Sequence, residues 1–211
     1  MNILEKIRTA TIEGNDEQLV KYVKEAMEEG LTTEEVIDDG FISAMAKVGE
    51  RFKNKEIFVP EMLVAAHAME QGIKELEPYL VGKERKYIAK MVIGTVRDDI
   101  HDIGKNLVSM MLKGNGVEVI DLGVDVPEEK FVEVVQKERP KFIGLSALLT
   151  TSMPALGSTI EALNKAGERD KVTVLVGGAP VSEGYAKQIG ADGYCENAIE
   201  AVDIIKEIVG E

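Results

Sequence analysis

The sequence predicts an α/β protein with a separate all-α N-terminal domain: a four-helix bundle over residues 1–80, and a five-stranded, parallel, doubly wound sheet of the Rossmann or flavodoxin type over residues 87–211. Two observations support this division. Residues 1–80 carry helix caps and apolar stripes at helical spacing and read as helices only. From residue 87 onward, short apolar runs alternate with amphipathic helices, the pattern of a parallel sheet with helices on both faces.

The helical part predicts an antiparallel bundle, because its helices are joined by short connections. Asn15 caps a helix over 17–29, and Thr32 begins a longer one. Pro60 fits the first turn of a last helix that ends near Leu76. The longer helix carries one apolar stripe, made of Ile37, Phe41, Ala44, Met45 and Val48.

A charged segment, residues 81–86, predicts a linker between the two domains, because Pro78 ends the last helix and Gly82 follows. We expect residues 77–86 to act as a hinge. Beyond the linker, the expected strands are 87–95, 118–121, 142–146, 172–176 and 193–195, and the expected helices are 103–115, 127–138, 153–165, 182–189 and 198–209.

Composition limits the functions open to the chain. A net charge of −13 argues against nucleic acid as a partner, since phosphate binding needs a surplus of Lys and Arg. The apolar runs fall short of the ~20 residues that span a membrane, and the first residues lack a signal-peptide core, so we expect a cytoplasmic protein. The single cysteine, Cys195, excludes an internal disulfide and a Cys-rich metal cluster, and we expect it to be a small buried hydrophobe.

The stretch 94–106 is the strongest candidate site, because it joins a buried strand to the head of a helix. It contains an Asp-x-His-x-x-Gly motif formed by Asp99, His101 and Gly104. An Asp two residues before a His can hydrogen-bond one ring nitrogen and leave the other free as a metal ligand. The alternative is a solvated loop histidine with no ligand. His67, the other histidine, is expected to be structural or on the surface.

Two further loops leave the same carboxyl edge of the predicted sheet. Residues 146–152 supply hydroxyl groups after the third strand, and Gly177 and Gly178 follow the fourth. A ligand at this edge can extend a long polar tail into the sheet while it meets His101 at the top. The alternative is that the hydroxyl groups of Ser146, Thr150 and Ser152 cap the next helix.

Taken together, these motifs resemble the cobalamin-binding corrinoid proteins of methyltransferase systems, including the cobalamin module of methionine synthase. The resemblance covers nearly the whole chain. It rests on Asp-x-His-x-x-Gly at 99–104, Ser-x-Leu at 146–148, Gly-Gly at 177–178, and the helical segments 45–52 and 58–61.

The resemblance implies a cobalamin bound base-off and His-on, with His101 as the lower axial ligand of cobalt. Asp99 then holds the imidazole, and Ser152 is the third member of the relay. Cobalt cycling between Co(I) and methyl-Co(III) changes its need for that ligand. The other cofactor-binding residues implied in this domain are Asp98, Ile100, Asp102, Gly104, Ser146, Leu148, Thr150, Gly177, Gly178, Tyr194 and Ala198.

The resemblance also implies that the helical domain caps the upper face of the corrin. Phe52, Val59 and Met62 match positions that shield the methyl group, and Asp38 matches a cap residue that contacts the cofactor. Val59 departs from the pattern, since relatives commonly have a larger aliphatic residue there. Without the resemblance, Phe52 and Val59 are interpreted as packing residues.

The implied function is a methyl-carrier subunit, not catalytic alone, that moves a methyl group between a substrate-specific methyltransferase and an acceptor methyltransferase; a reductive activase is a further expected partner. The methyl donor stays open among methanol, methylamines, glycine betaine and aryl methyl ethers. The alternatives are the cobalamin subunit of a carbon-skeleton mutase, a corrinoid-based sensor, and a flavodoxin-like domain without metal. The segment 45–60 argues against a mutase, which does not need this cap.

Overall fold

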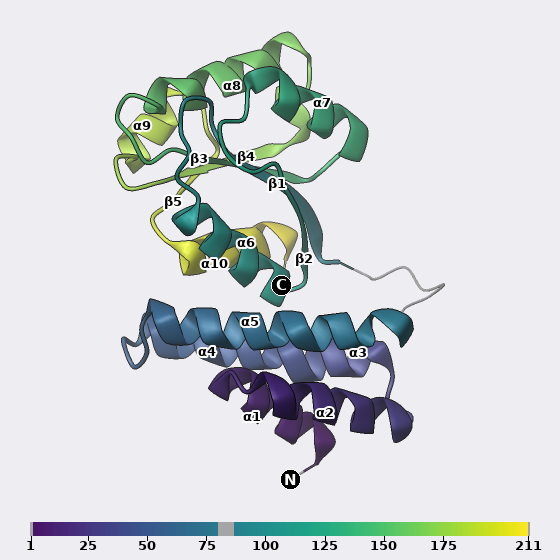
Figure 1. Cartoon of the computed structure of the whole chain (residues 1–211). Coiled ribbons are helices and arrows are strands. Elements are labelled where there is room, and N and C mark those ends of the chain that lie inside the picture. Colours follow the sequence, from purple (N-terminus) through teal and green to yellow (C-terminus); the bar gives the residue numbers. More distant parts are fainter. Residues whose placement is uncertain (1, 80–86, 211) are drawn as a thin grey trace. The chain divides into compact units, whose positions relative to one another are not determined.

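The computed structural model describes residues 2–79 and 87–210, which fall into a helical unit and an α/β unit (Figure 1). The predicted linker, residues 81–86, lies outside the described residues, and so does most of the predicted hinge. No helix in the described ranges is both long enough and apolar enough to cross a membrane.

The helical unit is the four-helix bundle that the sequence predicts. Its first two helices are α1 (Ile3–Glu13) and α2 (Asp16–Glu28). The third runs through α3 (Thr33–Glu35), the π-helix η1 (Val36–Ile42) and α4 (Ser43–Lys53), and the fourth is α5 (Val59–Leu76), followed by the 3-10 turn η2 (Glu77–Tyr79). The largest buried side chains between these helices are Ile7, Leu19, Phe41, Met45, Met62 and Leu76.

Local capping explains where these helices begin. The Asn15 carboxamide accepts a hydrogen bond from the Gln18 amide at 3.1 Å and starts α2. Thr32 and Glu35 form a reciprocal capping box, with the Thr32 amide donating to the Glu35 carboxylate at 2.8 Å. Both helix starts were predicted correctly. The π-helix was not predicted, because its i→i+5 hydrogen bonds leave no periodic signature in the sequence.

The α/β unit contains one parallel sheet with the strand order β2-β1-β3-β4-β5. This order and the helices on both faces confirm the doubly wound, flavodoxin-like class (Figure 1). Helices α7, α8 and α9 cover one face, and α6 and α10 cover the other. The strands are β1 (Ala89–Thr95), β2 (Val117–Asp121), β3 (Phe142–Ser146), β4 (Thr173–Gly177) and β5 (Gly193–Cys195), and the helices are α6 (Ile103–Gly114), α7 (Glu128–Glu138), α8 (Met153–Lys165), α9 (Glu183–Gln188) and α10 (Ala198–Val209), with a 3-10 turn η3 (Arg169–Lys171).

The register places one row of small residues across the carboxyl ends of four strands. Thr95 pairs with Ser146, Ser146 with Gly177, and Gly177 with Cys195. Residues paired across parallel strands share a face of the sheet. The alternate residues pack into the core formed with α7, α8 and α9, among them Val92, Ile143, Leu145, Val174 and Val176. The row therefore faces the side that α6 and α10 cover, and its side chains are small.

Candidate functional site at the carboxyl edge of the sheet

Asp99 and His101 are directly hydrogen-bonded in the loop between β1 and α6. Asp99 is 1% exposed, and its Oδ1 lies 2.8 Å from His101 Nδ1 and 3.0 Å from the His101 amide nitrogen. Thr95 donates its hydroxyl hydrogen to the His101 carbonyl at 2.9 Å, which fixes the backbone of the loop. With Nδ1 donating to Asp99, Nε2 carries the lone pair that a metal ligand requires. The His101 side chain itself is 45% exposed.

The second carboxylate oxygen of Asp99 joins this loop to the loop between β3 and α8. Asp99 Oδ2 accepts hydrogen bonds from the Leu148 amide at 2.7 Å, the Leu149 amide at 3.3 Å and the Ser152 hydroxyl at 2.6 Å. Burial alone raises the pKa of Asp99, but the hydrogen bonds from Ser152, from the His101 and Leu148 amides and from the imidazole outweigh it. They hold the pKa of Asp99 well below its usual range, so Asp99 is a carboxylate and a strong acceptor for His101.

The surface beside His101 is apolar. Ile100 and Ile103 are 74% and 81% exposed, and Leu148 and Leu149 are exposed on the neighbouring loop. A Cβ added at Gly104 would meet no atom of the described residues within 4 Å, so packing among them does not require a glycine there. Exposed apolar groups gathered around a polar ligand position mark a binding surface. Here they suit a broad, mostly apolar ligand.

The row of small residues lies at the same carboxyl edge of the sheet as this surface. Ser146 and Gly177 are half-buried in the row, and a Cβ at Gly177 would lie 3.0 Å from the Cys195 carbonyl oxygen. Within the described residues, the buried hydroxyl of Ser109, on α6, has no hydrogen-bond partner. A buried polar atom without a partner fits a site whose ligand completes it. The imidazole lone pair, the apolar surface and this row together fit a corrinoid with its nucleotide tail.

The remaining predicted residues of this domain differ in their exposure and in their hydrogen-bond partners. Asp98 is at the surface near Arg97, and Asp102 accepts a hydrogen bond from Asn106 at 3.0 Å. A side chain at Gly178, whose φ is +129°, would collide with the Ala147 carbonyl, so the fold itself requires this glycine. Thr150 is exposed at the loop and Ala198 is buried at the start of α10.

Tyr194 lies on the other face of the sheet from the row of small residues. It pairs with Val176 and packs against the core under α7, α8 and α9. Its neighbour Cys195 occupies the row beside Gly177 instead. Sequence reasoning did not single out Thr95, Ser109 or Cys195 for this site. The signal that identifies Thr95 and Cys195 is the strand register, which a single sequence does not supply.

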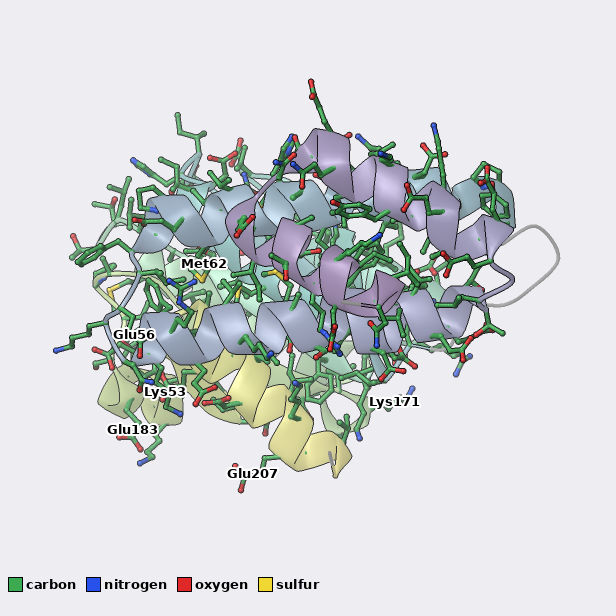
Figure 2. The ribbon with its side chains drawn as sticks, turned by 90° about the horizontal axis from the view of Figure 1, so that it is seen from below. Lys53, Glu56, Met62, Lys171, Glu183 and Glu207 are labelled. Atoms are coloured by element: carbon green, nitrogen blue, oxygen red, sulfur yellow. The ribbon has the colours of Figure 1, made fainter. Side chains whose placement is uncertain are left out.

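The predicted cap residues lie on three elements of the helical unit. Asp38 is exposed on η1, Phe52 is half-buried on α4, and Val59 is exposed at the start of α5. Met62 is fully buried, and Figure 2 shows it between the helices, whereas Lys53 and Glu56 point outward. His67 is at the surface, 3.5 Å from the Asp16 carboxylate, as predicted.

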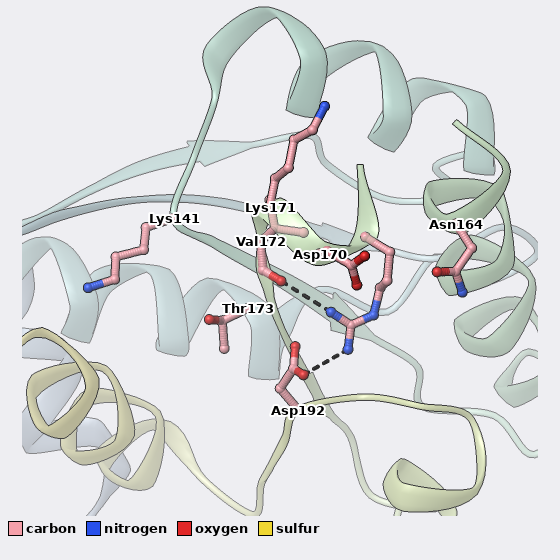
Figure 3. Close-up of a pocket in the computed structure, with 8 residues that line it drawn as sticks. Lys141, Asn164, Asp170, Lys171, Val172, Thr173 and Asp192 are labelled. Carbon is pink, nitrogen blue, oxygen red and sulfur yellow. Dashed lines mark hydrogen bonds and ion pairs between the residues drawn. The ribbon is translucent and has the colours of Figure 1, made fainter. Parts of the chain in front are cut away.

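A hollow of about 620 Å³ lies at the opposite, amino edge of the sheet, where Thr173 begins β4 (Figure 3). Its central guanidinium, that of Arg169, donates to the Val172 carbonyl at 3.1 Å and pairs with Asp192 at 2.8 Å. Lys171 pairs with Glu168 at 3.0 Å. These cations are already engaged in holding the corner together, so the hollow is a less suitable ligand site than the carboxyl edge.

The geometry defines a class: an α/β ligand-binding protein that presents an aspartate-held histidine at the carboxyl edge of a parallel sheet. Comparison with known proteins gives the family. The family described as B12 binding domain matches residues 89–203, and a second family with the same description matches residues 3–77. The chain belongs to the B12-binding family, and a corrinoid is its cofactor, as the sequence predicts.

Relatives match over almost the full length. A corrinoid protein of Desulfitobacterium hafniense is 38% identical over 100% of this chain and 99% of its own. The trimethylamine corrinoid protein of Methanosarcina barkeri is 41% identical over 97% of this chain and 95% of its own. Among solved structures, the methanol:cobalamin methyltransferase complex of Methanosarcina barkeri contains a chain that matches with a TM-score of 0.91 and 32% identity, over 99% of this chain and 80% of that chain.

Proposed function

We propose that this protein is a methyl carrier whose corrinoid is held base-off through His101 and passes a methyl group between two methyltransferases. One observation carries the proposal: Asp99 fixes the Nδ1 side of His101, so that Nε2 is free as a ligand at the edge of the sheet where such folds bind cofactors. The full-length likeness to corrinoid proteins named for trimethylamine and dimethylamine supports the same function.

The protein residues have separate tasks in this proposal. When bound, the corrinoid supplies a cobalt centre that accepts and releases a methyl group. His101 provides the lower ligand through Nε2. Asp99, kept ionised by its hydrogen bonds, accepts the hydrogen bond from Nδ1 and makes Nε2 a stronger electron-pair donor to a metal. Ser152 keeps the Asp99 carboxylate in place.

The row of small residues, between the sheet and the helices on that face, would hold the nucleotide tail. Ser146 and Thr150 offer hydroxyl groups to it, and Gly177 leaves room for it. Ser109 supplies the additional buried hydroxyl that the structure leaves without a partner. Asp98, Ile100, Asp102, Gly104, Leu148, Gly178 and Ala198 complete the proposed set in this domain. Tyr194, expected in this set from the resemblance, packs on the other face of the sheet and is not part of it.

The helical domain, residues 1–80, is proposed to cap the cofactor and exclude water and oxygen. Phe52, Val59 and Met62 form its apolar part, and Asp38 contacts the cofactor. The proposed division is this cap, a linker at 81–86 that lies outside the described residues, and the α/β domain at 87–211; the cap is proposed to open for partner enzymes. A substrate-specific methyltransferase, an acceptor methyltransferase and a reductive activase are the proposed partners, in the cytoplasm.

Reconstitution of the apoprotein with hydroxocobalamin tests the proposal. The absorbance of the loaded protein should show a base-off corrinoid with a nitrogen ligand from the protein. His101→Ala should lose that ligand, whereas His67→Ala, which removes the chain's other histidine, should not. After reduction, methyl iodide should methylate the bound cofactor once. Absence of corrinoid binding, or a His101→Ala spectrum equal to that of the unaltered protein, would refute the proposal.

A further inference from the structure

Asp125, in the loop between β2 and α7, makes two hydrogen bonds to the segment that carries Asp99. Its carboxylate oxygen Oδ1 accepts from the Asp98 amide at 2.8 Å, and its own amide donates to the Asp99 carbonyl at 2.8 Å. The two bonds enclose the peptide group between Asp98 and Asp99. One residue therefore fixes the main chain on both sides of the carboxylate that orients His101.

We call the two hydrogen bonds between Asp125 and the Asp98–Asp99 segment the Asp125 clasp. The two residues joined by its side-chain bond, Asp125 and Asp98, both have a left-handed backbone conformation. Asp125 has φ +52° and Asp98 has φ +64°, two of only four non-glycine residues with positive φ in the described parts of the chain. Aspartate and asparagine tolerate this region better than most residues, but it still carries a cost. The surrounding hydrogen bonds must outweigh that cost, so the conformation is imposed by the clasp.

The clasp completes the support of Asp99 from a third loop. The carboxylate of Asp99 is already tied to the β3–α8 loop through Leu148 and Ser152, and to His101. Its backbone is tied to the β2–α7 loop through Asp125. A neighbouring bridge between Val96 and Val126 keeps the two loops parallel. The Asp99 amide also donates to the Val96 carbonyl at 3.3 Å, so the bonds from Asp125 add to a main chain that is held at one other point.

Resting on the function proposed above, we propose that Asp125 is a positioning residue for the His101 ligand. It touches neither His101 nor the cofactor in this role. By holding the Asp98–Asp99 peptide, it sets the direction of the Asp99 carboxylate and thereby selects the imidazole tautomer with the proton on Nδ1. Without this support, the loop also adopts conformations in which Asp99 and His101 are not hydrogen-bonded. A smaller fraction of the protein then has the Nε2 lone pair of His101 available as a ligand.

Three variants separate the hydrogen bond from the backbone strain. Asp125→Asn keeps an oxygen acceptor and the left-handed preference, so it should behave like the unaltered protein. Asp125→Gly keeps the left-handed conformation but removes the acceptor, and Asp125→Ala removes both. The loss of one hydrogen bond of about 1 kcal/mol corresponds to about a fivefold shift in an equilibrium. We expect that shift, toward the form without the histidine ligand, in Asp125→Gly, and a larger one in Asp125→Ala.

Two measurements on the apoprotein keep this test independent of corrinoid binding. Nitrogen-15 chemical shifts of the imidazole, assigned with His67→Gln, should report proton on Nδ1 in the unaltered protein and in Asp125→Asn, and a mixture of tautomers in Asp125→Gly. The Asp98 amide of the unaltered protein should be protected from hydrogen exchange. In the loaded protein, the nitrogen splitting in the electron paramagnetic resonance of the cobalt(II) form should weaken in the same order.

The outcomes separate this inference from the proposed function. An Asp98 amide that exchanges like an open loop, or an unchanged tautomer and ligand population in Asp125→Gly, overturns the role of Asp125. A protein that binds no corrinoid, yet shows the expected tautomer shifts, overturns the proposed function and leaves the positioning role supported. If Asp125→Gly does not fold, the hydrogen-exchange protection of the Asp98 amide in the unaltered protein and in Asp125→Asn decides: protection in both supports the role of Asp125, and exchange like an open loop overturns it.

Discussion

Replacing Asp99 with Asn should separate the structural and ligand-orienting tasks of one buried carboxylate. Asp99 accepts hydrogen bonds on both oxygens: from His101 on Oδ1, and from Leu148 and Ser152 on Oδ2. An asparagine side chain has almost the same shape but one donor group in place of an acceptor. Whichever way the amide turns, its NH2 group meets N–H donors that previously had an acceptor.

The expected loss of stability follows from the polar groups that each orientation of the asparagine amide leaves without a hydrogen-bond partner. With the amide oxygen toward His101, the Leu148 amide and one asparagine hydrogen lose their partners in a site where residue 99 is 1% exposed. A buried polar group left unpaired costs about 1–3 kcal/mol, so we expect Asp99→Asn to lower the free energy of unfolding by roughly 2–4 kcal/mol. With the amide reversed, His101 Nδ1 must accept, which puts the proton on Nε2 and blocks ligation.

Urea unfolding of the apoprotein and the absorbance of the corrinoid-loaded protein together measure both effects. Asp98→Asn is the matched control, because it makes the same change one residue away on a side chain that is 83% exposed. The control should stay within about 0.5 kcal/mol of the unaltered protein. An Asp99→Asn variant as stable as this control, with its histidine ligand intact, would show that the reasoning is wrong.

The lowered pKa of Asp99 also predicts how the free energy of unfolding changes at acid pH. Hydrogen bonds hold the folded-state pKa of Asp99 below its ordinary value of 3.8, so folding favours the ionised form. The resulting stabilisation is fully present above that value and is lost as the pH falls from it toward the lower folded-state pKa. Urea midpoints measured from pH 6 down to pH 2 should therefore fall less steeply for Asp99→Asn than for Asp98→Asn, and equal slopes would count against this assignment.

Three further predictions use residues around the site. Gly104→Ala should leave urea stability unchanged or slightly higher, because its Cβ would meet no atom of the described residues within 4 Å, but it should weaken hydroxocobalamin uptake, because the added methyl group stands in the proposed cofactor surface. Gly178→Ala should destabilise the apoprotein by its collision with the Ala147 carbonyl; equal effects of the two changes on urea stability contradict this distinction. Lys105→Met should cost about 1–3 kcal/mol in the same urea assay, because the buried ammonium pairs with Asp121, which is partly exposed; a change below about 0.5 kcal/mol contradicts it. Burial, with a smaller effect of Glu200, raises the pKa of Cys195 to about 12, so iodoacetamide at pH 8 should alkylate it slowly in the folded protein and rapidly in urea; equal rates contradict this.

Much of the fold could be predicted because local signals decide it. Caps such as Asn15 and Thr32 fix helix starts, and the alternation of apolar runs with helices specifies a parallel sheet. Helix α8 and strands β3 and β5 have the predicted bounds. The π-helix η1 could not be predicted, because its hydrogen bonding does not change the pattern of apolar residues.

The part of the site that lies within the single loop between β1 and α6 could be predicted from the sequence. Asp99 and His101 are two residues apart, so their hydrogen bond can be anticipated from spacing, and the resemblance to corrinoid proteins pointed to Ser152. Asp125 was missed because its partners, Asp98 and Asp99, are on another loop, 27 and 26 residues earlier in the chain. The position of Tyr194, away from the row that contains Cys195, depends on a strand register that periodicity does not fix.

Isotope labelling of histidine tests most directly whether His101 supplies the lower ligand. The protein is prepared with nitrogen-15 histidine, loaded with unlabelled cobalamin and reduced to the cobalt(II) form for electron paramagnetic resonance. We predict that the three-line nitrogen splitting of the unlabelled protein becomes two lines in the labelled protein and in labelled His67→Gln. A three-line splitting that persists in the labelled protein would assign the ligand to the cofactor's own base and contradict the account.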